Sequence, residues 1–130
     1  MFSREELAGI FLSIPTAEVS VVKANNMATG YRVRLRICIR GKLEYLQAIQ
    51  RSLLQSEIKC VIKEKENKQR QKPILIISDK KSMERVLTLV PHKPSNVNWH
   101  VFDEIFVLYM WQRHLTQEGL DEILELKGVL

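Results

Sequence analysis

Basic and aliphatic residues alternate along residues 31–40, which read Tyr-Arg-Val-Arg-Leu-Arg-Ile-Cys-Ile-Arg. Successive side chains of a β-strand point to opposite faces of the sheet, so this period of two predicts a strand with two unlike faces. One face carries Arg32, Arg34, Arg36, Cys38 and Arg40, and the other carries the aliphatic residues Val33, Leu35, Ile37 and Ile39. The basic row is longer than the one or two lysines that usually protect an edge strand. We expect a cationic surface over a core, although a merely solvated strand face gives the same pattern.

The length and composition are those of one globular domain. The chain has 130 residues, of which 45% are hydrophobic and 27% are charged, so we expect a single domain, with a core over residues 1–94 and additional helices over 95–130. No apolar run is long enough to span a membrane, and the first residues lack the layout of a signal peptide, which predicts an intracellular protein without a membrane partner. Cys38 and Cys60 have no zinc-like spacing and are expected to be reduced, packed or half-packed thiols.

The positive charge is concentrated in the part of the chain that contains the expected strands. Residues 18–72 hold thirteen Lys or Arg against five Asp or Glu, a net charge of +8, whereas the remainder holds seven against ten, a net charge of −3. The two parts account for the net charge of +5 of the whole chain. Such segregation favours attraction of a phosphate backbone to one surface, without reading its sequence.

Local patterns predict the remaining elements. Ser3 and Glu6 have the spacing of a capping box, and Pro15 ends the helix that follows. Residues 25–30 are rich in turn formers, and residues 64–72 form a polar, mostly basic loop that a ligand could order. The expected helices are 4–14, 42–55, 79–90 (capped by Ser78 or Asp79), 97–114 and 117–127 (capped by Thr116), and the expected strands are 18–24, 31–40, 57–63 and 73–78. Pro91 and Pro94 lie in a linker.

The order of these elements predicts the fold class. Two αββ halves follow one another, and a further helix and a helical tail come after them. This is an α+β arrangement, αββαββα, with a four-stranded antiparallel sheet, helices on one face and the other face open.

Residues 7–15, Leu-Ala-Gly-Ile-Phe-Leu-Ser-Ile-Pro, together with this order, resemble the LAGLIDADG family of homing endonucleases and the DNA-binding and splicing proteins derived from it. The resemblance spans about residues 5–90 and implies a saddle-shaped sheet. It also implies that small residues of the first helix pack at a twofold axis, and a single motif copy implies a homodimer. The dimer-interface residues implied in this way are Leu7, Ala8, Gly9, Phe11 and Leu12.

In the family, sheet residues face the major groove of duplex DNA, which makes double-stranded DNA the implied partner. Arginine side chains can read guanine edges or hold phosphates. The candidate nucleic-acid-binding residues are Lys23, Arg32, Arg34, Arg36, Arg40, Lys59, Lys63, Lys65, Lys68 and Arg70.

The catalytic chemistry of the family has no counterpart at the expected positions. Ile14 stands where the family has its metal-binding acid, Pro15 replaces the final glycine, and Leu12 replaces the other motif acid. Mg²⁺ requires oxygen ligands, so we expect no metal, no cofactor and no catalytic residue at this site. Glu18 is an alternative ligand, but it lies in the next expected strand. The family often has a lysine between its third helix and the next one. Lys93 lies near that position, but Asn98 and Trp99 align with it better.

These observations predict a non-catalytic, double-stranded-DNA-binding homodimer. One alternative is an active metal-dependent homing endonuclease that uses Mg²⁺ and an unrecognised carboxylate. A second is an RNA-binding splicing cofactor, because phosphate attraction does not distinguish RNA from DNA. A third is a protein-interaction module whose arginine face meets an acidic partner and whose helix 97–114 docks on another protein.

Overall fold

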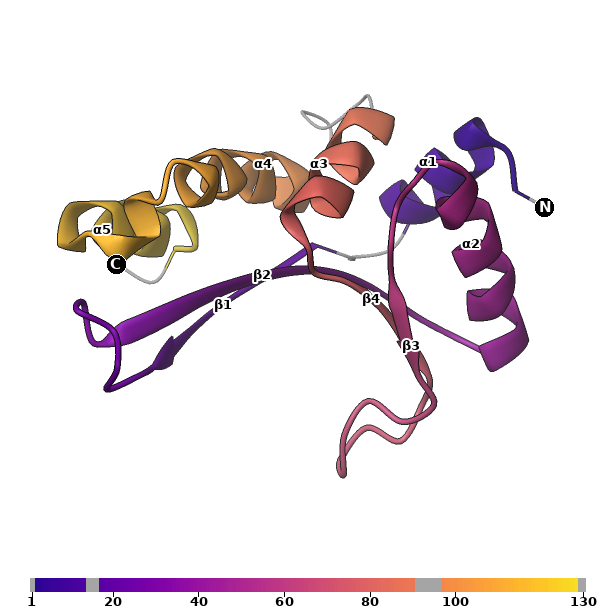
Figure 1. Cartoon of the computed structure of the whole chain (residues 1–130), viewed down its shortest axis with the longest axis horizontal. Helices are drawn as coiled ribbons and strands as arrows, with labels where there is room; N and C mark the ends of the chain where they lie inside the picture. Colours follow the sequence, from indigo (N-terminus) through magenta and orange to yellow (C-terminus); the bar gives the residue numbers. More distant parts are fainter. Residues whose placement is uncertain (1, 14–16, 91–96, 129–130) are drawn as a thin grey trace. The chain divides into compact units, whose positions relative to one another are not determined.

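The computed structural model describes residues 2–13, 17–90 and 97–128. In them, four strands form one antiparallel sheet in the order β1-β2-β4-β3, accompanied by five α-helices and one 3-10 helix (Figure 1). The predicted α+β class is therefore confirmed. Ile14, Pro15, Pro91, Lys93 and Pro94 lie outside the described residues.

The chain forms two compact units that are interleaved in sequence. Unit 1 comprises residues 1–16 and 36–92, and unit 2 comprises residues 17–35 and 93–130. Unit 1 contains α1 (Arg4–Ser13), the second half of β2 (Tyr31–Arg40), α2 (Leu43–Gln55), β3 (Val61–Lys63), β4 (Ile74–Ile77) and α3 (Lys80–Leu89). Unit 2 contains β1 (Ala17–Lys23), the first half of β2, α4 (Val97–Met110), the 3-10 helix η2 (Arg113–Leu115) and α5 (Gln117–Leu126). The single domain expected from the sequence stays a prediction. The expected boundary after residue 94, between a core and additional helices, does not coincide with the boundaries of the two units.

Unit 1 begins with the predicted capping box. The Ser3 amide donates to Glu6 Oε1 at 3.0 Å, and the Glu6 amide donates to Ser3 Oγ at 3.1 Å, so two backbone donors at the start of α1 are satisfied. The hydrogen bond from the Ser3 backbone lowers the pKa of Glu6. Asp79 caps α3 by accepting from the Ser82 amide at 3.0 Å, as one of the two predicted caps.

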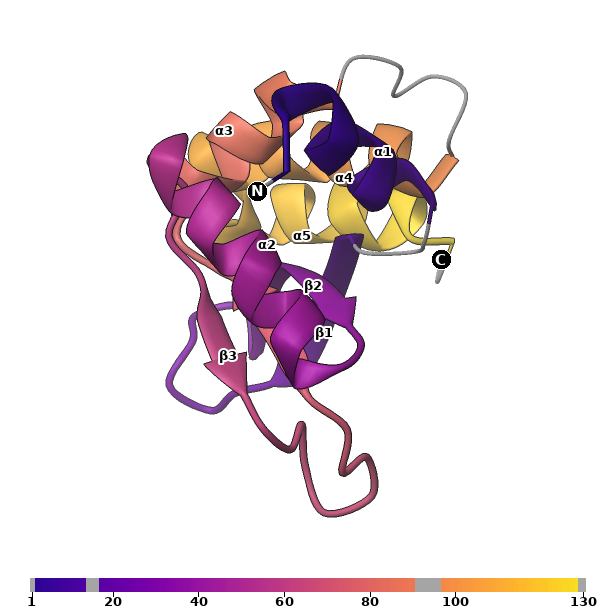
Figure 2. The ribbon, with the colours of Figure 1, turned by 90° about the vertical axis from the view of Figure 1, so that its right-hand side faces the viewer.

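The helices of unit 1 pack on one face of its strands. α2 contacts β4 and α1 contacts α3, and these helices lie on the same side of β4 (Figure 1). Leu46, Ile49 and Leu53 of α2 are buried, whereas Leu54 is 55% exposed. The connection between β3 and β4 extends away from the helices of this unit (Figure 2).

β3 is shorter than the predicted strand 57–63. Glu57 has a left-handed backbone with a φ of 60°, and the Ile58 amide donates to the Leu53 carbonyl at 2.9 Å. The Lys59 amide donates to Ser82 Oγ at 2.8 Å. These backbone groups bond outside the sheet, so the alternating pattern of residues 57–60 does not produce ladder pairing.

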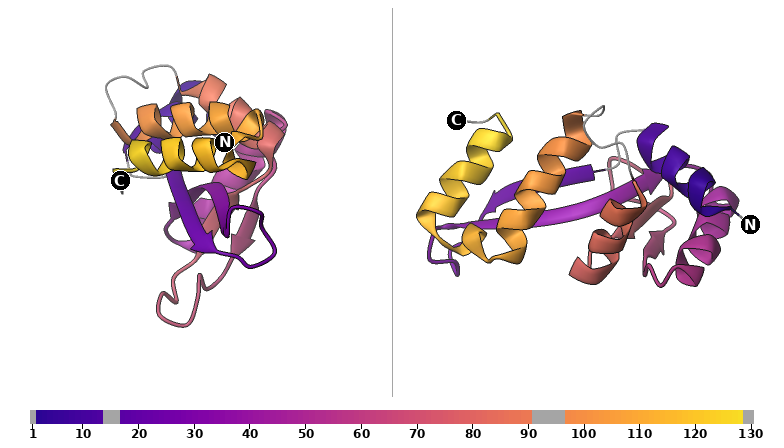
Figure 3. Two further views of the ribbon diagram at one scale, coloured as in Figure 1. Left: turned by 90° about the vertical axis from the view of Figure 1, so that its left-hand side faces the viewer. Right: turned by 90° about the horizontal axis from the view of Figure 1, so that it is seen from above.

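Unit 2 packs two helices on a hairpin. α4 contacts β1, and α4 and α5 lie side by side and antiparallel (Figure 3). Trp99, Phe102, Ile105, Leu120 and Ile123 are buried. The Lys127 ammonium donates to the Val19 carbonyl at 2.8 Å and so ties the end of α5 to β1.

The prediction of one helix over residues 97–114 is wrong at its end, because α4 stops at Met110. Gln112 adopts a left-handed backbone with a φ of 59°, which ends the helix and starts η2. Thr116 then caps α5 as predicted, accepting at Oγ1 from the Gly119 amide at 3.1 Å. Within the part of the chain that the structure describes, no helix has the length and apolar character needed to span a membrane.

Candidate nucleic-acid interface

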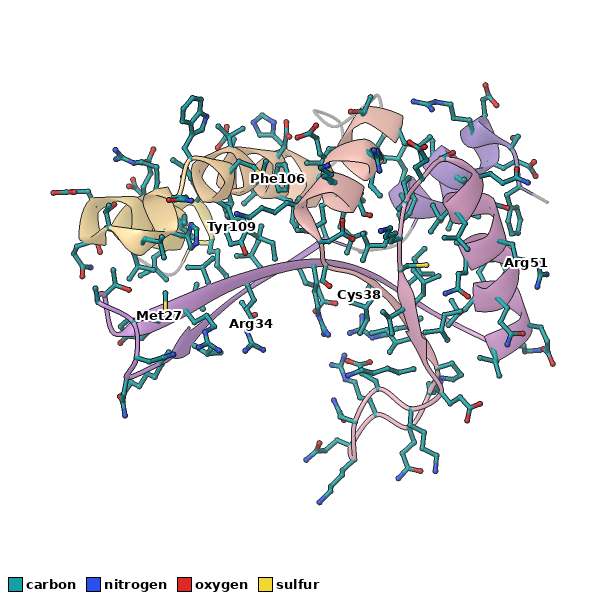
Figure 4. The ribbon with its side chains drawn as sticks, viewed as in Figure 1. Met27, Arg34, Cys38, Arg51, Phe106 and Tyr109 are labelled. Atoms are coloured by element: carbon teal, nitrogen blue, oxygen red, sulfur yellow. The ribbon has the colours of Figure 1, made fainter. Side chains whose placement is uncertain are left out.

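In unit 2, the alternation along β2 produces the two predicted faces. Val33 and Leu35 are buried, whereas Arg34 is exposed and Arg32 is half-buried. Figure 4 shows Arg34 directed to the side of β2 opposite α4 and α5. The Arg32 guanidinium reaches Asn26 Oδ1 in the β1–β2 loop at 3.4 Å. The face away from the helices of unit 2 is therefore basic.

In unit 1, the register of the sheet places two more cations on a common row. Arg40 pairs with Ile74, and Ile74 pairs with Lys63. Directly opposed residues of antiparallel strands share a face, so Arg40 and Lys63 lie on the same face about 10 Å apart, on either side of Ile74. Ile39, Leu75 and Ile62 form the neighbouring row, which points to the other face.

Cys38 departs from the expected solvent-facing row. Its relative exposure is 1% although it shares the parity of Arg34, Arg36 and Arg40. Its cross-strand neighbour is Ile76, whose own neighbour is Val61, so the row through Cys38 is apolar. The buried Cys38 and half-buried Cys60 agree with the prediction of packed or half-packed thiols. Burial raises the pKa of Cys60 to about 11, which leaves it protonated and unreactive at neutral pH.

Glu66 is the residue of this surface that sequence reasoning missed. Its carboxylate accepts two hydrogen bonds from Arg40, from Nε to Oε1 at 2.7 Å and from Nη2 to Oε2 at 3.0 Å. Arg36 Nη2 and Arg70 Nη1 approach Oε2 at 3.7 and 4.0 Å. The Glu66 side chain is 9% exposed, and the hydrogen bond from Arg40 lowers its pKa. One carboxylate thus gathers three arginines from β2 and the β3–β4 connection, which we name the Glu66 cluster.

The β3–β4 connection forms a turn with its own hydrogen bonds. The Glu66 amide donates to the Lys72 carbonyl at 3.1 Å and the Asn67 amide to the Arg70 carbonyl at 2.9 Å. Asn67 Oδ1 accepts from the amides of Gln69 and Arg70 at 2.9 and 2.7 Å. The predicted binding residues of this segment, Lys65, Lys68 and Arg70, are exposed on it.

The remaining predicted binding residues lie at strand ends or outside the strands. Lys23 is exposed at the end of β1, in unit 2. Lys59 precedes β3 in unit 1 and lines a cavity of about 440 Å³ beside the first turn of α3, with Asp79, Lys81 and Ser82 among the other lining residues. Lys59 therefore does not belong to the row of Arg40 and Lys63, because it precedes β3 and its amide bonds to Ser82 and not to a neighbouring strand.

The residues expected at a dimer interface have different environments. Leu7, Ala8 and Phe11 are buried within the single chain, with exposures of 1%, 9% and 0%. Gly9 is exposed and Leu12 is half-buried. Three of the five residues therefore belong to the chain's own core. The dimer interface stays a prediction, and of these five residues only Gly9 and Leu12 have accessible surface for it.

The described residues include no group of three or more His, Cys, Asp or Glu side chains that could hold a metal ion. Glu18, the alternative ligand, is half-buried in β1. Trp99 has 1% exposure and belongs to the core of unit 2, where its ring meets that of Phe102 edge-on at 6.0 Å.

No protein-family model and no curated protein sequence matches the chain. Solved structures do resemble it. The homing endonuclease I-TnaI is 22% identical with a TM-score of 0.77, over 96% of this chain and 85% of that one. The K262A mutant of I-SmaMI is 17% identical with a TM-score of 0.79, and it is matched over 97% of this chain but 44% of its own.

The LAGLIDADG homing endonuclease I-LtrWI, in a structure bound to its target DNA, is 20% identical with a TM-score of 0.78. The match covers 99% of this chain and 44% of I-LtrWI, so the chain spans less than half the length of I-LtrWI and of I-SmaMI. These likenesses agree with the element order αββαββα and with the antiparallel sheet described above. The chain has the fold of the LAGLIDADG homing endonucleases, as the sequence of its first helix and the order of its elements predicted.

Proposed function

We propose that this protein binds double-stranded DNA through the helix-free face of its sheet, as a homodimer, without cleaving it. The observation that carries the proposal is the basic parity of β2: Arg34 is exposed on the face opposite the helices of unit 2, and Arg36 and Arg40 share that parity in unit 1. Guanidinium groups bind phosphates and guanine edges by paired hydrogen bonds, so a row of them suits a duplex.

The structural neighbours support duplex DNA as the partner. I-SmaMI has been solved bound to an uncleaved DNA target with calcium ions, and I-LtrWI has been solved bound to its target DNA. Both share the fold with this chain at identities of 16% and 20%. DNA binding by this chain is inferred from that likeness together with its own basic residues.

The homodimer is inferred from the single copy of the first-helix motif at residues 7–15, because the family resemblance implies that two such helices pack together at a twofold axis. Gly9 and Leu12 of α1 provide surface at which a second copy could pack.

The absence of cleavage is inferred from the sequence of the first helix. Ile14 and Pro15 occupy the positions where the family resemblance implies an acid and a glycine. An aliphatic side chain supplies no oxygen ligand to Mg²⁺, and a metal-assisted displacement needs such ligands. The chain's arginines would then position DNA without activating a nucleophile.

The test is binding to a random pool of duplex DNA at two salt concentrations, first with EDTA and then with Mg²⁺, with the same samples examined for cut strands. The proposal expects salt-dependent binding with intact DNA in Mg²⁺. Cut DNA would overturn the non-catalytic part, and an absence of binding at low salt would overturn the whole. Tighter binding of an RNA competitor would assign the surface to RNA.

A matched pair of variants locates the interface. Arg34→Glu reverses a charge on the basic face, and Arg51→Glu makes the same change on α2, where Arg51 is exposed and points away from the sheet (Figure 4). Only Arg34→Glu should weaken binding, by about tenfold or more at low salt. Equal loss in both variants would mean that net charge alone, and not this face, governs binding.

A further inference from the structure

Within unit 2, the two C-terminal helices leave an apolar groove between them. The groove has a volume of about 410 Å³ and is lined by Glu104, Val107 and Leu108 of α4 and by Glu122 and Leu126 of α5. Val107 is 51% exposed. The lining is therefore aliphatic apart from two glutamates, one from each helix.

An exposed tryptophan lies one helical turn beyond Val107, one of the residues that line this groove. The Trp111 amide donates to the Val107 carbonyl at 3.1 Å, which continues the helical hydrogen bonding and places Trp111 one turn beyond Val107. Trp111 is 79% exposed, Met110 before it is 39% exposed, and Leu115 four residues after it is 43% exposed. Trp99, the other tryptophan of the chain, is 1% exposed. A large aromatic side chain left in water next to exposed aliphatics is typical of a protein-binding surface.

The charge around the groove is opposite to that of the sheet face. Residues 97–128 contain six Asp or Glu and two Lys or Arg, a net charge of −4 with neutral histidines. Glu104 is 48% exposed and lies 3.3 Å from His100 Nε2. Glu118, Asp121, Glu122 and Glu125 are all exposed on α5. A surface of this sign repels nucleic acid and attracts a cationic partner.

We propose that the groove between α4 and α5, with Trp111 at its end, docks a basic amphipathic helix of a partner protein. An apolar side chain of that helix would enter the groove over Val107, Leu108 and Leu126. Lysines or arginines one turn to either side would meet Glu104 on α4 and Glu122 on α5. The charge complementarity selects a basic helix over an acidic one, and an amphipathic helix in a groove is a common mode of peptide recognition.

The probe is a synthetic amphipathic peptide of about 18 residues, built from Leu and Lys at helical spacing, titrated into the full chain without DNA while tryptophan emission is recorded. Because Trp99 is already buried, a shift of the emission to shorter wavelength reports burial of Trp111. The expected result is a saturable blue shift that is absent with the matched Leu/Glu peptide. An equal response to the acidic peptide would overturn the proposal.

Two pairs of variants distinguish binding of the basic peptide at this groove from its general attraction to acidic residues elsewhere on the protein. Replacing Glu104 and Glu122 by Gln should weaken peptide binding by about fivefold or more, whereas replacing Glu5 and Glu84 of unit 1 by Gln removes the same charge and should leave it unchanged. Equal weakening would overturn the proposal. Val107→Asp should also abolish the shift, with circular dichroism confirming that the helices remain folded.

A second copy of this chain is the competing occupant of the groove. Sedimentation that depends on protein concentration and is lost in Trp111→Ala would assign the groove to a second copy and overturn the proposal. The Arg34→Glu variant should bind the peptide as the wild type does, because Arg34 is on the other face of β2. The outcome is therefore independent of whether the chain binds DNA.

Discussion

The Glu66 carboxylate accepts two hydrogen bonds, of 2.7 and 3.0 Å, from the Arg40 guanidinium in the basic part of unit 1. A bidentate carboxylate occupies the same guanidinium edge that a phosphate or a guanine would use. Because Arg36 and Arg70 also approach Glu66 Oε2, the carboxylate offsets positive charge where the proposed interface needs it. DNA that engages Arg40 must compete with Glu66.

Glu66→Gln should therefore strengthen binding to random duplex DNA, about three- to tenfold at low salt. The substitution preserves shape but removes the charge that competes with phosphate. Filter binding or fluorescence anisotropy at two salt concentrations measures the change. Glu64→Gln, which removes the same charge from an exposed residue of the same connection, is the control. Equal gains in both variants would show that the cluster itself does not regulate binding.

The pH dependence of stability follows from the lowered pKa of Glu66. The hydrogen bond from Arg40 holds this pKa below its ordinary value of 4.5, so the folded state disfavours protonation. The stabilisation is fully present above pH 4.5 and is lost as the pH falls through the lowered pKa.

The wild type should melt about 3 °C above Glu66→Gln at pH 7, which corresponds to an interaction of about 1 kcal/mol. This difference should shrink as the pH is taken below 4.5. Thermal melts followed by circular dichroism at both pH values provide the measurement. A difference that stays constant with pH would mean that Glu66 stabilises unit 1 through its shape alone.

The elements whose signals are local could be predicted. The strand over residues 31–40 follows from alternation, and the start of α1 follows from the spacing of Ser3 and Glu6. Those patterns need no knowledge of the sheet. In the first half of β2, parity alone predicted the exposed face of Arg34 and the buried face of Val33.

The missed features depend on register and tertiary partners. Cys38 is 1% exposed and lies opposite Ile76 in the sheet, although it shares the parity of the exposed Arg34, and local periodicity does not show this difference. Glu66 lies in a loop rich in basic residues, and only the path of that loop brings its carboxylate to Arg40. The end of α4 depends on the left-handed backbone of Gln112, a residue type that gives no strong helix-stop signal.

Gly119 is predicted to be indispensable to the fold of unit 2. A Cβ at this position would overlap the Arg113 carbonyl oxygen, so the junction between η2 and α5 would have to move. Gly119→Ala should destabilise the chain by about 2 kcal/mol or more, despite the better helix propensity of alanine. Urea denaturation monitored by circular dichroism measures the change. An unchanged unfolding midpoint would show that the junction relaxes freely.

Gly9→Leu should dissociate the proposed homodimer without unfolding the chain. A Cβ at Gly9 meets no described atom within 4 Å, and the residue is exposed on α1, so the single chain has room for a larger side chain. If two copies pack closely at this position, a leucine holds their helices apart. Sedimentation equilibrium should give a monomer mass for Gly9→Leu and a dimer mass for the wild type. The control Glu44→Leu, which adds a leucine to the exposed surface of α2, should remain dimeric. A Gly9→Leu protein that stays dimeric would place the association surface away from α1, and a wild type that is monomeric at high concentration would refute the dimer itself.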